Sequence, residues 1–136
     1  MSDTIEIKVR GYHLDVYGHV NNARYLEFLE EGRWALFDGK LDLTDWQTRG
    51  LSFFVVNINI NYRRPAALGQ TLKIHSFLSR IGRSSGVIRQ EVFIKASGEL
   101  AADADITFVI ADSSRGKALP LTGDLAREFE IFQPRK

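Results

Sequence analysis

One stretch of this chain, residues 23 to 37, has the residue spacing of a long helix, and most of the later sequence alternates as strands do. Its apolar residues recur at helical spacing, and they are Tyr25, Leu26, Phe28, Leu29, Leu36 and Phe37. This apolar face is broader than a surface helix requires, which predicts a helix embraced by a curved sheet. Gly32, a weak helix former, lies within the face, so we expect a neighbouring backbone close to it.

Other stretches show the period-two alternation of half-buried strands. The clearest runs from 51 to 64, where Val56, Ile58, Ile60 and Tyr62 alternate with polar residues and Pro65 then ends the ladder. This alternation predicts a strand with one dry face and one amide-rich face. The remaining strands are expected at 4 to 10, 70 to 81, 86 to 97 and 100 to 112.

Turn and cap residues connect these elements. The GRSS sequence at 82 to 85 joins two of the strands, and Ser97–Gly98 predicts a two-residue hairpin between the next two. Thr44 is expected to cap a short helix that ends at Gly50, with Trp46 turned inward.

A C-terminal packing helix completes the predicted architecture. Its apolar residues Leu125, Phe129 and Phe132 recur at helical spacing. Only the helix at 23 to 37 is long enough to cover a sheet, so the economical arrangement is a single antiparallel sheet with one central helix. The sequence therefore predicts an α+β fold, and at 136 residues a single domain over 1–136.

Composition excludes several classes of function. Eighteen basic against seventeen acidic residues give a formal net charge of +1, with no general attraction to nucleic acid or anionic membranes. The absence of cysteine excludes disulfides, thiol catalysis and thiolate metal sites. No His/Glu spacing resembles a metal site, so no metal is expected. The N-terminus lacks the apolar core of a signal peptide and no apolar run is long enough for membrane insertion, so we expect a cytoplasmic protein.

The candidate catalytic residues lie in or next to the acidic turn at 13 to 21, immediately before the long helix. Asp15 precedes Asn22 by seven residues, and Asn22 is the predicted N-cap of the helix. His19 and Tyr25 lie in the same segment. A carboxylate, the partial positive charge of a helix N-terminus and an apolar wall are what acyl-transfer hydrolysis needs.

Each of these residues also has a structural interpretation. Taken alone, an Asp before a glycine-containing turn is more often an Asx-turn residue than a catalyst, and only the neighbouring His19, Asn22 and Tyr25 favour catalysis. His19 either acts in acid–base chemistry or orients the turn, and Tyr25 is either a core residue or reaches the lip of a pocket. The sequence contains no Gly-x-Ser-x-Gly motif and no plausible Ser/His/Asp triad.

Basic residues lie in two loops that would suit phosphate groups. Arg64 lies in the loop at 64 to 69, and Arg83, Ser84 and Ser85 lie in the GRSS turn. If these loops lie together, they form a cationic rim with hydroxyl donors. A solvated surface is the alternative for each residue taken separately.

Two segments, DVYGHVNNARYLEFLEE at 15 to 31 and NININYRRPA at 57 to 66, carry a resemblance to a known family. With DADITFV at 103 to 109, they resemble the hotdog-fold acyl-CoA thioesterases of the 4-hydroxybenzoyl-CoA thioesterase group. The likeness extends over nearly the whole chain and is strongest to bacterial long-chain acyl-CoA thioesterases of the thioesterase III type.

The resemblance implies a five-stranded antiparallel sheet wrapped around the long helix. It also implies homodimers joined edge to edge, often paired into homotetramers, with active sites at subunit boundaries. In the family pattern the catalytic carboxylate matches Asp15, and the backbone N–H that polarises the thioester carbonyl matches Asn22. His19 and Tyr25 match positions that line the site, and coenzyme A enters only as part of the substrate.

Three hypotheses for function emerge. The leading one is hydrolysis of acyl-CoA thioesters, with long-chain fatty acyl groups expected. The second is a non-catalytic module of the same fold that binds acyl-CoA or an acyl carrier, with Asp15 only bracing the turn. A hotdog hydratase or dehydratase ranks last, because the acidic and histidine residues of those enzymes are placed differently from this D-x-x-x-H-V-N-N run.

Overall fold

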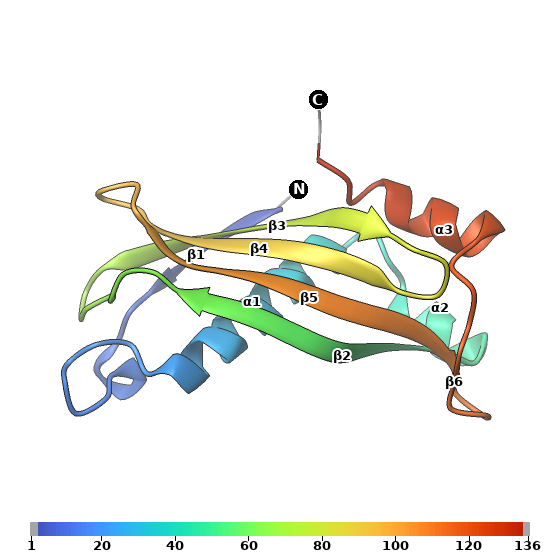
Figure 1. Cartoon of the computed structure of the whole chain (residues 1–136), viewed down its shortest axis with the longest axis horizontal. Coiled ribbons are helices and arrows are strands. Elements are labelled where there is room, and N and C mark those ends of the chain that lie inside the picture. The colour runs from blue at the N-terminus through green and yellow to red at the C-terminus, as the bar shows by residue number, and fades with distance from the viewer. Residues whose placement is uncertain (1–2, 135–136) are drawn as a thin grey trace. The chain divides into compact units, whose positions relative to one another are not determined.

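The computed structural model describes residues 3–134, which form a sheet and three α-helices (Figure 1). The strands pair in the order β1-β3-β4-β5-β2, and the short β6 pairs with β5. Their bounds are β1 Thr4–Lys8, β2 Leu51–Tyr62, β3 Thr71–Ile81, β4 Gly86–Ile94, β5 Leu100–Asp112 and β6 Lys117–Ala118. The helices are α1 Asn22–Phe37, α2 Leu43–Thr48 and α3 Gly123–Glu130, and a 3-10 turn spans Gly11–His13. The predicted α+β class is confirmed, with β6 as an additional two-residue strand.

The chain forms two compact units, each built from three separate segments. The first unit comprises Met1–Leu36, Ile60–Ser76 and Gln90–Ala104. The second comprises Phe37–Asn59, Phe77–Arg89 and Asp105–Lys136. A single domain over 1–136 stays a prediction.

In the first unit, α1 packs closely on β3 and β4 at Gly32. A Cβ at Gly32 would lie 2.8 Å from Nε2 of Gln90, 2.9 Å from Cγ2 of Ile74 and 3.1 Å from Oγ of Ser76. The close approach predicted at Gly32 is therefore confirmed, although side chains rather than backbone make it. Gln90 donates to the Leu29 carbonyl oxygen (2.8 Å), and this bond ties the middle of the helix to the sheet.

The helix buries less of its apolar face than the spacing predicts. Tyr25, Phe28 and Leu29 are buried, whereas Leu26 remains 40% exposed, so its assignment to the inner face was wrong. Conversely, the charged Arg33 is buried and donates to Oε1 of Gln90 (3.1 Å). Burial lowers the pKa of Arg33, and the hydrogen bond to Gln90 replaces part of the hydration that its guanidinium loses.

The second unit has an aromatic core. Phe108 on β5 stacks on Phe53 and on Phe129, with ring centroids 4.7 and 5.1 Å apart, and Trp46 meets Phe129 edge to face. Trp46 is buried, as predicted, and its indole N–H donates to Glu128 on α3. In the second unit, α2 and α3 are therefore joined by the hydrogen bond from Trp46 to Glu128 and by the ring contact between Trp46 and Phe129.

Gly86 illustrates how tightly this aromatic core is packed. A Cβ at Gly86 would lie 2.4 Å from Cζ of Phe108, a ring that cannot retreat because Phe53 and Phe129 stack on it. We expect Gly86→Ala to lower the free energy of unfolding by about 3 kcal/mol, measured by denaturant titration. Gly82→Ala, in the turn immediately before β4, is the control and should leave stability nearly unchanged, because the nearest contact of its Cβ would be at 3.4 Å. Equal stabilities of the two variants would contradict the packing argument.

Strand β2 is less buried than its alternation predicts. Val56 is 56% exposed and Tyr62 49% exposed, while Ile58 and Ile60 are half-buried. The prediction of a dry face is wrong for the single chain, because β2 ends the strand order and, among residues 3–134, pairs with β5 alone. By contrast, the predicted inner face of β5 is confirmed, and its fully buried residues are Ala102, Ala104, Ile106, Phe108 and Ile110.

Two turn predictions also need correction. The hairpin after β4 spans four residues, 95 to 98, because Ile94 donates to the Glu99 carbonyl oxygen and the strand ends at Ile94. The cap of α2 is Asp42, whose carboxylate accepts from the N–H groups of Thr44 and Asp45.

Among residues 3–134, no helix is long and apolar enough to cross a membrane.

Candidate active site

The acidic turn is held rigidly on both sides within the first unit. Its two arms meet where the Asp15 N–H donates to the His19 carbonyl oxygen at 2.8 Å. The Val20 N–H donates to the Ala66 carbonyl oxygen, and a β-bridge pairs His19 with Ala67. Gly18, with φ +78°, has a left-handed conformation that glycine adopts without strain. These contacts fix the direction in which the turn enters α1.

Helix α1 begins one residue earlier than predicted. Oδ1 of Asn21 accepts from the Ala23 N–H at 2.9 Å, so Asn21 is the N-cap and Asn22 is the first helical residue. The prediction of Asn22 as the cap was wrong. In the described part of the chain, no hydrogen-bond acceptor is found for the Asn22 N–H. A free N–H at a helix N-terminus, where the helix dipole is positive, attracts a negative oxygen.

Asp15 is half-buried and has one oxygen engaged. Its Oδ1 accepts from the N–H groups of Tyr17 (2.9 Å) and His19 (3.3 Å), which is an Asx-turn arrangement. Within residues 3–134, Oδ2 has no hydrogen-bond partner. The carboxylate thus braces the turn with one oxygen and keeps the other available.

A pocket of about 370 Å³ lies beside this turn and at the start of α1. Its polar lining comes from His19, Asn22, Arg63 and Arg64. Its apolar lining comes from Val20, Tyr25, Tyr62 and Pro65. The structure therefore brings three of the four predicted catalytic residues together around one pocket, while Asp15 lies next to the lining residue His19 and does not itself line it.

The two tyrosines form the wall of the pocket. Their rings meet edge to face with centroids 5.4 Å apart, and Tyr25 also meets Phe28. Burial, with a smaller contribution from Tyr62, raises the pKa of Tyr25 to about 12, and burial also raises the pKa of Tyr62. Both phenols therefore stay protonated near neutral pH, so neither serves as a base.

The arginines of the pocket are each paired with a carboxylate. Arg63 donates to both oxygens of the buried Asp103 at 3.2 Å, and Arg64 lies 3.2 Å from Glu99. The Arg64 side chain is 64% exposed, so water weakens that pair and the guanidinium remains accessible to a second anion.

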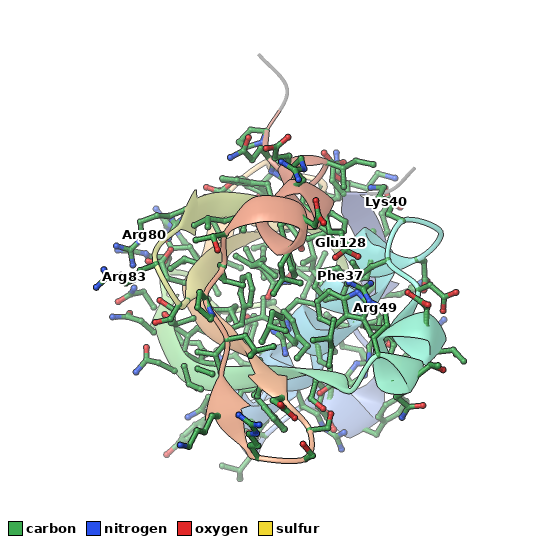
Figure 2. All side chains as sticks on the ribbon, turned by 90° about the vertical axis from the view of Figure 1, so that its right-hand side faces the viewer. Phe37, Lys40, Arg49, Arg80, Arg83 and Glu128 are labelled. Carbon is green, nitrogen blue, oxygen red and sulfur yellow. The ribbon has the colours of Figure 1, made fainter. Side chains whose placement is uncertain are left out.

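The remaining predicted binding residues lie in the second unit. Arg83, Ser84 and Ser85 belong to the turn between β3 and β4, which is closed by the Gly82 N–H donating to the Ser85 carbonyl oxygen. Figure 2 shows Arg83 and Arg80 projecting outward at this end of the second unit. Because Arg64 belongs to the first unit, a joint cationic rim stays a prediction.

The other histidines have structural surroundings. Nδ1 of His13 accepts from the Arg10 N–H at 2.9 Å, and burial together with Arg24 lowers the pKa of its ring. His75 lies 3.6 Å from both Asp3 and Glu91. In the part of the chain that is described, no cluster of three acidic or histidine side chains is arranged to hold a metal ion.

The sequence patterns do not predict every residue at the site. Val20 and Arg63 line the pocket without a local signal, and Asn21 rather than Asn22 caps α1. Tyr62, assigned only to a strand face, donates from its hydroxyl to the Asn22 carbonyl oxygen at 3.1 Å. No local signal reveals this bond, because 40 residues separate the partners.

The fold and this site define a class of protein, and comparison with known proteins identifies it. Residues 9–129 match the family model of the thioesterase-like superfamily. The chain belongs to this superfamily, and the predicted hotdog fold is confirmed.

Individual relatives sharpen the comparison. The chain is 52% identical over 126 residues to the long-chain acyl-CoA thioesterase FadM of Escherichia coli K12, covering 92% of this chain and 95% of FadM. It is also similar to the crystal structure of the E. coli probable thioesterase YbaW, with TM-score 0.89, 50% identity, and 96% and 98% of the two chains covered. A 1,4-dihydroxy-2-naphthoyl-CoA thioesterase from Synechocystis shares the fold, with TM-score 0.82, 20% identity, and 96% and 98% covered.

Proposed function

We propose that this protein hydrolyses acyl-CoA thioesters to a free fatty acid and coenzyme A. The observation that carries the proposal is the pocket beside the start of α1, where a free backbone N–H meets a tyrosine-lined wall. The 52% identity to a long-chain acyl-CoA thioesterase supports both the reaction and the choice of long acyl chains as substrates.

The chemistry follows from the charges at the pocket. The thioester carbonyl oxygen accepts from the Asn22 N–H, and the helix dipole stabilises the negative charge that develops there. Asp15, through Oδ2, either removes a proton from the attacking water or attacks the carbonyl carbon itself to give a mixed anhydride. In both routes the carbon–sulfur bond breaks, and the thiolate of coenzyme A takes up a proton that comes from the water. In the second route water then cleaves the mixed anhydride, which releases the fatty acid and restores the Asp15 carboxylate.

The pocket lining supplies the other proposed roles. His19 and Tyr25 orient the substrate beside Asn22, with Tyr25 as an uncharged donor. Arg64, Arg83, Ser84 and Ser85 are the proposed partners of the coenzyme A phosphates. A thiolate leaves readily, so the reaction requires neither a metal nor an organic cofactor.

The remaining proposals concern assembly and location. We expect a homodimer or homotetramer in the cytoplasm, without nucleic-acid partners. The exposed apolar residues Val55 and Val56 on the terminal strand β2 support edge-to-edge pairing of two copies, because such an edge is rarely left bare. Size-exclusion chromatography with light scattering measures the assembly, and a strictly monomeric protein would contradict it.

One observation favours a second candidate, the non-catalytic binding module. Oδ1 of Asp15 is engaged in the turn and Asp15 does not line the pocket, as expected of a residue that only braces the loop. In that case the protein binds acyl-CoA without cleaving it.

Release of thiol separates the two candidates. The protein is mixed with acyl-CoA substrates of increasing chain length and a thiol-reactive dye. We expect catalytic turnover that rises towards long chains. Saturable binding of acyl-CoA without thiol release would instead support the binding module.

A further inference from the structure

We propose that Tyr62 is a positioning residue that holds the Asn22 N–H in the direction needed to bind the oxyanion. The inference rests on the proposed thioesterase function and adds to it a residue outside the predicted catalytic set. It follows from the hydrogen bond between the hydroxyl of Tyr62, the last residue of β2, and the carbonyl oxygen of Asn22, the first residue of α1.

The carbonyl groups on both sides of the Asn22 N–H have partners. The Asn21 carbonyl belongs to the same planar peptide as this N–H, and it accepts from the Arg24 N–H at 2.9 Å. The Asn22 carbonyl belongs to the next peptide, and it accepts from Tyr62 at 3.1 Å. The Ala23 N–H on that second peptide donates to the Asn21 side chain. Both peptides that flank Asn22 are thereby fixed in orientation.

The Tyr62 ring is itself held in place. It packs edge to face against Tyr25, which is 3% exposed and follows Asn22 by less than one helical turn. Its raised pKa keeps the hydroxyl protonated, so it continues to donate across the neutral range. Tyr62 therefore presents a fixed donor to the helix terminus.

Such a tie matters because the first turn of a helix frays. The first N–H groups of a helix lack intrahelical acceptors, and the tie from β2 limits how far the terminus opens. Stabilisation of an oxyanion depends on donors whose positions are set before the reaction begins. Loss of the tie should weaken binding of the transition state more than binding of the ground state.

Tyr62→Phe tests this inference because it removes only the hydroxyl. We expect kcat to fall about tenfold while KM changes by less than about twofold, because the pocket wall is retained. The matched control is Tyr12→Phe, since Tyr12 is an exposed tyrosine of the same unit that does not line the pocket. That variant should keep the wild-type kcat, and the thermal unfolding midpoint of both variants checks their folding.

A pair of inhibitors provides the decisive measurement. A fluorinated ketone analogue of acyl-CoA, which adds water to become tetrahedral, should bind Tyr62→Phe about tenfold more weakly, in parallel with kcat. A thioether analogue without a carbonyl should bind both proteins equally. Wild-type kcat in Tyr62→Phe, or equal weakening of both inhibitors, would overturn the inference. A wild-type protein that releases no thiol would overturn the proposed function, and this inference with it.

Discussion

Asp15→Asn is expected to lower kcat/KM for acyl-CoA hydrolysis by about 100- to 10,000-fold while the protein stays folded. The amide oxygen of asparagine still accepts from the N–H groups of Tyr17 and His19, so the Asx turn survives. What is lost is the negative charge that activates water or attacks the carbonyl carbon. The measurement is thiol release together with the thermal unfolding midpoint.

Asp15→Ala is the matched comparison for this variant. It removes the hydrogen bonds to the turn as well as the charge, so it should be inactive and also less stable by about 1 kcal/mol. If Asp15 only braces the turn, the two variants should differ in activity. Asp15→Asn should then keep the wild-type rate of thiol release, and Asp15→Ala should lose it together with stability. Near-normal turnover in Asp15→Asn would therefore end its assignment as the catalytic carboxylate.

Asn22→Pro is expected to lower kcat by about 100- to 1,000-fold, because proline has no N–H to stabilise the oxyanion. Asn22 is the first residue of α1, where proline is well tolerated since its backbone angle suits a helix start. The preceding residue Asn21 is an N-cap, whose extended backbone is also what a following proline favours. The variant should thus fold normally.

Asn22→Ala separates the backbone from the side chain at this position. Alanine restores the N–H and removes the exposed amide, so turnover should remain within about threefold of the wild type. Wild-type turnover in Asn22→Pro would show that this N–H does not take part. Equal losses in the two variants would point to the side chain instead.

Much of this architecture follows from local sequence patterns. The periodicity of apolar residues predicts the long helix, the five strands and the buried inner face of β5. On β5 the alternate residues from Ala102 to Ile110 are all apolar, as a face against the core requires. The position of Gly32 predicted a close approach, and Gln90 makes it. Short-range signals therefore determined the elements and the segment that holds the site.

Details that depend on distant contacts could not be predicted. Two adjacent asparagines are equally good caps, and the choice of Asn21 depends on its N–H donating to the His13 carbonyl oxygen. The role of Tyr62 depends on a partner 40 residues away. The exposure of Val56 follows from the position of β2 in the strand order, which alternation alone does not reveal.

A crystal structure with an acyl-CoA analogue in which a methylene group replaces the thioester sulfur would show whether the Asn22 N–H binds the carbonyl oxygen. This ketone keeps the carbonyl oxygen and resists hydrolysis. We expect its oxygen to lie about 3 Å from the Asn22 nitrogen, with Oδ2 of Asp15 on the side of the carbonyl carbon. A carbonyl that points away from the start of α1, or an acyl group bound outside the tyrosine-lined pocket, would contradict this expectation.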